Sequence, residues 1–194
     1  MAGHDDARVW RQSFVPPREQ APYIERPQRQ LDAFANPSVR FEVRGLEPPD
    51  HFFHPLTEFR CAAQSIRNAL EAERAGYDGF VIGHFQEPEL LKTRGSLEIP
   101  VIALGEAALL TACGMGRRIG LVTIDPAFID WHERQVSAHG LGERLAGGRD
   151  RGIAWIAMVR AIRRQAGENS NPISESAARM RVANGLKANP CAFS

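Results

Sequence analysis

The chain has 194 residues, of which 43% are hydrophobic and 24% are charged. This is an ordinary globular composition, sufficient for one domain or two small lobes. The formal net charge of +1 provides no general field that would attract nucleic acid or an anionic membrane. The cysteines Cys61, Cys113 and Cys191 are far apart and odd in number, which argues against a disulfide framework or a CxxC metal site.

Neither a leader nor a membrane span is predicted. The opening MAGHDDARVW lacks the apolar core of a signal peptide. No apolar run approaches the roughly 20 residues that cross a bilayer. We therefore expect a soluble, cytoplasmic protein with no membrane and no nucleic-acid partner.

In chain order, the first predicted elements are a strand over 8–14, a helix over 19–35 and a strand over 39–46. The first strand mixes β-branched and aromatic residues, and the second alternates apolar and polar side chains. Pro27 falls inside the predicted helix and is expected to kink or split it, at a cost of about 3 kcal/mol.

The clearest helix is predicted from Pro55 to Ala75, with Gly76 as its expected stop. The continuous apolar run GFVIGHF at 79–85 predicts a strand that is covered on both faces. A short helix is expected near 88–93.

Four further elements are predicted before the pattern fades: a strand over 99–105, a helix over 106–116, a strand over 118–124 and a helix over 127–140. Residues 147–194 differ from what precedes them, because they contain eight Lys and Arg against three Asp and Glu. They also lack strand-like runs, and we expect a basic tail that is partly disordered.

Alternating strands and helices with short connections predict an α/β fold, with a parallel sheet and helices on both faces. Ligands of such sheets bind at the carboxyl ends of the strands. The polar residues at these predicted ends are Gln12, Ser13, His84, Gln86, Glu87, Glu106, Thr123 and Asp125.

The strongest of these candidates is His84, because histidine titrates near neutral pH and can act as a general acid or base. The alternative is a structural histidine bonded to backbone. Ser13 and Thr123 could bind a substrate carboxylate or could cap the helices that follow them. Glu106 is favoured as an ordinary first-turn charge.

Other histidines carry weaker signals. His132 and His139 are seven residues apart and would share one helix face. A solvated face is the preferred interpretation over a pair of metal ligands, and no metal site is predicted.

Three blocks taken together, GFVIGHFQEPEL, IPVIALGEAALLTAC and RIGLVTIDPAFIDWHERQV, resemble the aspartate/glutamate/hydantoin racemase superfamily. The N-terminal RVWRQSFVPPREQAPYI fits a hydantoin-racemase-like branch, and the resemblance covers residues 7–146. It implies two similar α/β lobes with the active site between them and no cofactor.

The family uses two cysteines, one per lobe, on opposite sides of the substrate's α-carbon. The first ends a strand in a motif like CFGDP. This chain has HFQEP there, so His84 stands in place of the cysteine, Gln86 in place of the glycine and Glu87 in place of the aspartate. Cys191 follows no buried strand, and the second catalytic role is not assigned to it.

The resemblance divides the chain into a first lobe (7–116), the start of an incomplete second lobe (117–146) and an atypical tail (147–194). It implies a cofactor-independent racemase or isomerase that abstracts a proton α to the carbonyl of an amino acid, hydantoin or short carboxylic acid. His84 would be catalytic, and the substrate would contact a set of polar residues: Gln12, Ser13, Gln86, Glu87 and Thr123.

Two alternatives remain open at this point. The chain could be a truncated, non-catalytic family member whose tail arose by a shifted reading frame. It could also be a protein that binds a small carboxylate and has given up the chemistry. In either case an incomplete second lobe would make a homo-oligomer plausible.

Overall fold

The computed structural model describes three stretches of the chain: residues 6–47, 55–123 and 128–146. The predictions for the tail lie outside the described residues. The chain divides into two units, of which the first comprises residues 1–121 and 130–146, and the second comprises 122–129 and 147–194. The positions of the two units relative to one another are not determined, and the description below concerns the first.

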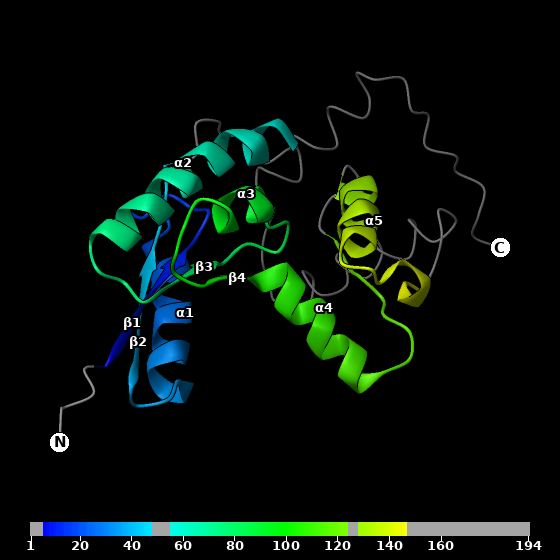
Figure 1. Ribbon diagram of the computed structural model, residues 1–194, viewed down its shortest axis with the longest axis horizontal. Helices are drawn as coiled ribbons and strands as arrows, with labels where there is room; N and C mark the ends of the chain where they lie inside the picture. Colours follow the sequence, from blue (N-terminus) through cyan, green and yellow to red (C-terminus); the bar gives the residue numbers. More distant parts are fainter. Residues whose placement is uncertain (1–5, 48–54, 124–127, 147–194) are drawn as a thin grey trace. The chain divides into compact units, whose positions relative to one another are not determined.

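A four-stranded parallel sheet forms the centre of the first unit (Figure 1). Its strands are β1 (Ala7–Gln12), β2 (Val39–Arg44), β3 (Gly79–Ile82) and β4 (Val101–Ala103). The spatial order is β2-β1-β3-β4, and Gln12 at the end of β1 pairs with both Arg44 and Ile82. The predicted α/β fold with a parallel sheet is confirmed.

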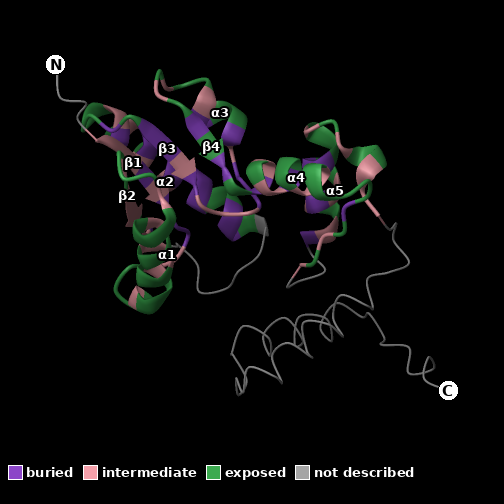
Figure 2. Ribbon diagram, turned by 90° about the horizontal axis from the view of Figure 1, so that it is seen from below, coloured by how far each residue is buried: buried purple, intermediate pink, exposed green. Residues whose placement is uncertain are grey.

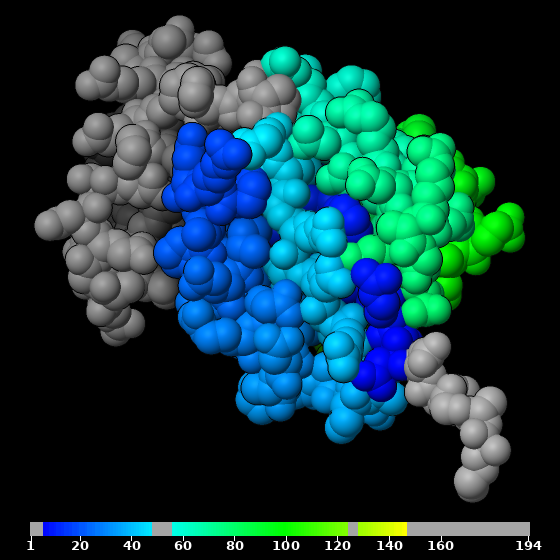
Figure 3. Space-filling view, turned by 90° about the vertical axis from the view of Figure 1, so that its left-hand side faces the viewer, coloured from blue at the N-terminus to red at the C-terminus, as the bar shows by residue number. Residues whose placement is uncertain are grey.

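The helices follow the strands in the predicted order. They are α1 (Ala21–Phe34), α2 (Pro55–Arg74), α3 (Leu90–Arg94), α4 (Leu104–Met115) and α5 (Ile129–Ala138), with a 3-10 turn at Gly142–Arg144. Gly76 has a φ of +74°, as expected for a residue that ends a helix in the left-handed region. In the space-filling view, α1 and α2 lie on either side of the edge strand β2 (Figure 3).

Helix α1 continues through Pro27, so this proline removes a backbone donor but does not split the helix. The expectation of a fifth strand was wrong. The strand predicted over 118–124 is absent from its described part, where Ile119 forms only an isolated bridge with Leu145. Ile119 is buried against Leu109 and Val136, so its apolar character reflects packing between helices and not membership of the sheet.

The main core lies on one face of the sheet, where successive strand residues alternate between faces. Buried side chains of the strands meet the apolar faces of α2 and α3, and Figure 2 shows these buried segments in purple. The central members are Trp10, Phe80, Ile82, Val101 and Ala103 from the strands, with Cys61, Ala69 and Ala72 from α2 and Leu90 from α3.

A cluster of charged and aromatic side chains, centred on Glu42, lies at the β2 edge of the sheet. The Glu42 carboxylate accepts hydrogen bonds from Arg44 (2.8 Å), from the Tyr77 hydroxyl (2.5 Å) and from Arg8 (3.2 Å). The bond from Arg44, the largest cause, and the bond from Tyr77 lower the pKa of Glu42 from 4.5 to about 2. The cluster therefore ties β1, β2 and the turn after α2 together.

This cluster gives a test of acid stability. Because the folded pKa of Glu42 lies below its unfolded value, its stabilisation is present above pH 4.5 and is lost as the pH falls towards 2. Its side chain is 40% exposed, so solvent screening limits the effect to about 1 kcal/mol. Glu42→Gln is expected to lower the free energy of unfolding by this amount at pH 7, measured by urea titration.

The difference between wild type and Glu42→Gln should shrink to nothing between pH 4.5 and pH 2. Glu25→Gln is the control, since Glu25 forms an exposed helical pair with Arg29 and its replacement should change stability by less than about 0.5 kcal/mol. A constant difference across the pH range would contradict the assignment.

No helix within the described stretches has the length and apolar character needed to cross a membrane.

Candidate functional site

The carboxyl ends of β1 and β3 meet where the sequence placed its candidate residues. Strand β3 ends at Ile82, and the Gly83 amide then donates a hydrogen bond to the Gln12 carbonyl at 2.8 Å. A Cβ on Gly83 would lie 2.6 Å from that oxygen, so only glycine allows this close approach. The chain therefore delivers Ser13 and His84 from adjacent strand ends.

The His84 imidazole lies in a defined pocket of side chains. Its Nε2 is 2.8 Å from Oε1 of Glu58, which belongs to the first turn of α2. The ring of Phe14 stacks on the imidazole with centroids 4.6 Å apart and planes at 13°. The His84 side chain keeps 17% exposure, whereas that of Glu58 has none, so the imidazole is the group that can reach a ligand.

Glu87 turns back from this strand end towards α4 and α5. Its amide donates to the His84 carbonyl (3.1 Å), and its φ of +41° is in the left-handed region. One carboxylate oxygen accepts the Glu106 amide at the start of α4 (2.7 Å), and the other pairs with His139. Glu87 thus satisfies a donor at a helix N-terminus, as a capping carboxylate does.

Glu106 forms a two-bond ion pair with Arg94 of α3 (2.9 and 2.5 Å). The hydrogen bond from Arg94 is the largest cause that lowers the pKa of Glu106. Glu106 is a first-turn charge of α4, as the sequence indicated, and it contributes to holding α3 and α4 together.

Side chains of helix α5 form hydrogen bonds to the backbone of the loop that follows β3. Trp131 donates its indole N–H to the Gln86 carbonyl (3.1 Å), and Gln135 donates to the Phe85 carbonyl (2.6 Å). His132 lies 3.0 Å from the side-chain oxygen of Gln135, with its Nδ1 as the contacting atom. These contacts fix the backbone on which His84 is carried.

The expectation of a solvated face for the two α5-region histidines was wrong. His132 is only 7% exposed, and His139 pairs with Glu87. Burial, the largest cause, lowers the pKa of His132 against the opposing effect of its bond to Gln135. The face that carries these histidines is polar but points into the protein. A spacing of seven residues is the same for a face that points into the protein and for one that points to water. Within the described stretches, no three His, Cys, Asp or Glu side chains converge on a metal site.

Most of the predicted site residues lie near the ends of β1 and β3, and Thr123 does not belong to the same unit. Gln12 is fully buried and bonds to Trp10, Asn68 and the carbonyls of Ser13 and Arg44. Ser13, Gln86 and Glu87 are buried around the same loops. Thr123 belongs to the second unit, whose position relative to His84 is not determined.

Sequence reasoning missed Glu58, Trp131 and Gln135. An acidic residue in the first turn of a helix is the usual complement of the helix dipole, so Glu58 carried no sign of burial. Trp131 and Gln135 reach carbonyl groups 45 and 50 residues away in the chain. No local pattern announces a contact of that separation.

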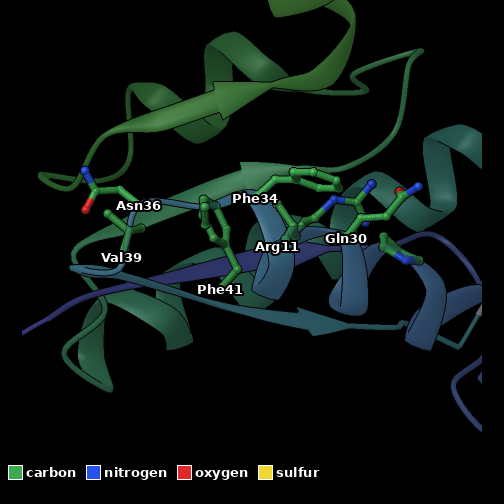
Figure 4. Close-up of a pocket in the computed structure, with 9 residues that line it drawn as sticks. Arg11, Gln30, Phe34, Asn36, Val39 and Phe41 are labelled. Atoms are coloured by element: carbon green, nitrogen blue, oxygen red, sulfur yellow. The ribbon is translucent and has the colours of Figure 1, made fainter.

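A separate cavity of about 670 Å³ lies between α1 and the β1–β2 edge of the sheet. Figure 4 shows Arg11, Gln30, Phe34, Asn36, Val39 and Phe41 around it. Burial lowers the pKa of the Arg11 guanidinium there. None of the predicted site residues lines this cavity.

Comparison with known proteins identifies the fold. An allantoin racemase from Klebsiella pneumoniae superposes with a TM-score of 0.61 at 23% identity, over 72% of this chain and 56% of that one. An allantoin racemase from Pseudomonas fluorescens superposes with a TM-score of 0.59 at 21% identity, over 82% of this chain and 69% of that one. A maleate isomerase from Pseudomonas putida S16 superposes with a TM-score of 0.50 at 14% identity, over 74% of this chain and 63% of that one. The chain thus spans little more than half of the first of these enzymes.

The search of curated protein sequences found no match. The Asp/Glu/hydantoin racemase family model matches residues 21–188. This match extends past residue 146, where the resemblance was expected to end, and therefore includes most of the segment that was expected to be atypical. On this match, which covers most of the chain, the protein belongs to the Asp/Glu/hydantoin racemase family.

Proposed function

We propose that this protein is a cofactor-independent racemase or isomerase that moves a proton α to the carbonyl of a small substrate. One observation carries the proposal. His84 occupies the carboxyl end of β3, where the family motif has its first cysteine, and its imidazole is paired with a buried carboxylate at 2.8 Å. An imidazole at this position can act as a general acid or base towards a bound substrate.

In the proposed reaction, neutral His84 accepts the α-proton and becomes an imidazolium. The electron pair of the broken C–H bond passes to the carbonyl oxygen and forms an enolate. When the His84 imidazolium returns a proton to the same face of the α-carbon, the carbonyl and the neutral imidazole are restored and the substrate exchanges with retention. Inversion requires a second acid that protonates the opposite face, and the His84 imidazolium then releases its proton to solvent, so that atoms and electrons balance in both cases.

The other predicted residues have supporting roles in this proposal. The Ser13 hydroxyl and the Gln86 amide bind the substrate's polar groups. Gln12 acts through Ser13, since its side chain bonds to the Ser13 carbonyl. Glu87 holds the loop between β3 and α4.

The proposed substrates are hydantoins first, then amino acids and short carboxylic acids. Two of the similar structures are allantoin racemases, and allantoin is a substituted hydantoin whose reactive C–H lies between a ring nitrogen and a carbonyl. Similarity of this kind shows the fold, so the substrate remains part of the proposal. We also propose that the enzyme works in the cytoplasm.

Solvent deuterium incorporation at the α-carbon tests the proposal directly. The protein is incubated in D2O at neutral pH with allantoin, 5-substituted hydantoins, amino acids or short dicarboxylates, and the loss of the α-proton signal is followed by NMR. Exchange well above the uncatalysed rate is expected with at least one hydantoin. His84→Asn should lower the rate by about 10²–10⁴-fold, the usual contribution of a general acid or base.

Glu25→Gln, on the exposed part of α1, is the control and should exchange substrate at the wild-type rate. Absence of exchange with every substrate would sink the enzymatic proposal. If a substrate raised the melting temperature without any exchange, the binding-only alternative would take its place.

A further inference from the structure

We infer that Glu58 is a positioning residue for His84, fixing which ring nitrogen exchanges the proton and in which direction it points. This inference rests on the proposed role of His84. It concerns a residue from another element, 26 positions earlier in the chain.

The first step is the isolation of the carboxylate. The Glu58 side chain has no exposed surface, and its one hydrogen bond to a described side chain is the bond to His84. Its second oxygen is buried with no hydrogen-bond partner among the described residues. Buried polar side-chain atoms normally have a hydrogen-bond partner, and the side-chain partner of this carboxylate among the described residues is His84.

The second step is the tautomer. We place the ring proton on Nε2, because the atom that faces Glu58 can then donate to a carboxylate oxygen. In the neutral ring the lone pair is then on Nδ1, which becomes the nitrogen that takes the substrate proton. The positive charge that forms on the ring is stabilised by the adjacent carboxylate, as in other carboxylate–histidine pairs.

The third step is the orientation of the ring. Phe14 stacks on one face of the imidazole at 13°, which fixes the plane of the ring. Glu58 fixes its rotation within that plane through the 2.8 Å bond, and the turn from His84 to Glu87 fixes its backbone. Together these contacts aim Nδ1 in one direction before a substrate arrives, which is how preorganised groups accelerate proton transfer.

The tautomer is measured first, because this needs no variant and no substrate. In protein labelled with 15N-histidine, at a pH where the ring is neutral, the His84 signals should be those of protonated Nε2 and unprotonated Nδ1. Protonation at Nδ1 in the wild type would overturn the inference, whatever the activity.

Kinetics of Glu58→Gln provide the second readout, in the deuterium-exchange assay. The amide conserves shape but can donate as well as accept, so the ring should become a mixture of tautomers. We expect kcat to fall by about 10²-fold with KM changed less than about threefold, because the substrate does not touch Glu58 in the proposal.

Glu73→Gln is the matched control, since it makes the same change on the same helix, and the Glu73 carboxylate accepts hydrogen bonds from backbone amides just before β4. It should leave both kcat and the His84 tautomer unchanged. A wild-type kcat in folded Glu58→Gln would overturn the inference. If the wild type shows no exchange at all, the proposed function fails, while the tautomer measurement still decides the role of Glu58.

Discussion

Replacement of Gly105 by alanine is expected to lower the free energy of unfolding by about 3 kcal/mol or more. A Cβ at this position would lie 2.2 Å from the Phe85 carbonyl, 2.4 Å from the Gln135 amide nitrogen and 2.8 Å from a Glu87 carboxylate oxygen. The first of these is backbone and cannot rotate away. The measurement is urea unfolding followed by circular dichroism at pH 7.

The same substitution should also disturb the site. The methyl group would separate Gln135 from the Phe85 carbonyl and Glu87 from the Glu106 amide, which are bonds of 2.6 and 2.7 Å. These bonds hold the loop that carries His84. The exchange activity of the folded fraction should therefore fall together with the stability.

Gly114→Ala is the control for this prediction, since it makes an identical change in the same helix. A Cβ on Gly114 would meet nothing within 4 Å, and alanine is a better helix former than glycine by about 0.5–1 kcal/mol. Gly114→Ala should therefore be neutral or stabilising. Equal effects of the two substitutions would show that the close packing around Gly105 is wrong.

Truncation of Phe80 to alanine is expected to cost about 3–5 kcal/mol, the usual range for a buried phenylalanine. Phe80 is fully buried in the central strand β3 and packs beside Trp10 with ring centroids 6.4 Å apart. The cavity would open in the main core under α2, two residues before the strand ends. Loss of this much stability is a large part of the total for a small protein.

The control for this truncation is Phe34→Ala. Phe34 is the last residue of α1 and is 87% exposed, so the same loss of a ring should change stability by less than about 0.5 kcal/mol. Thermal unfolding of both variants beside the wild type makes the comparison. A loss for Phe80→Ala no greater than that for Phe34→Ala would contradict the assignment of the core.

The main architecture follows from local patterns in the sequence. β-Branched and aromatic residues predicted β1, alternation of apolar and polar side chains predicted β2, and continuous apolar runs predicted β3 and β4. Helical spacing and glycine stops predicted the long helix α2. Because parallel strands place their carboxyl ends at one edge, the end of the 79–85 run was enough to predict the place of His84. Where this reasoning failed, as at Ile119, an apolar residue was packed between helices instead of within a sheet.

The partners of His84 depended on the tertiary structure. The pattern of a helix shows which of its faces is apolar but not which element that face will meet, so it gave no sign that Glu58 at the start of α2 is buried. The sequence likewise showed that His132 and His139 are seven residues apart, but not that their side chains point into the protein.

The amino-acid sequence by itself determined the parallel α/β fold, the family and the strand end that carries the imidazole. Only the tertiary structure decided that a buried carboxylate from α2 pairs with that imidazole, and that α5 fastens the loop beside it. The physical reason for this difference is the distance along the chain over which each interaction acts. Strand and helix patterns arise between residues a few positions apart. Burial and pairing of charges arise between residues brought together by the whole fold.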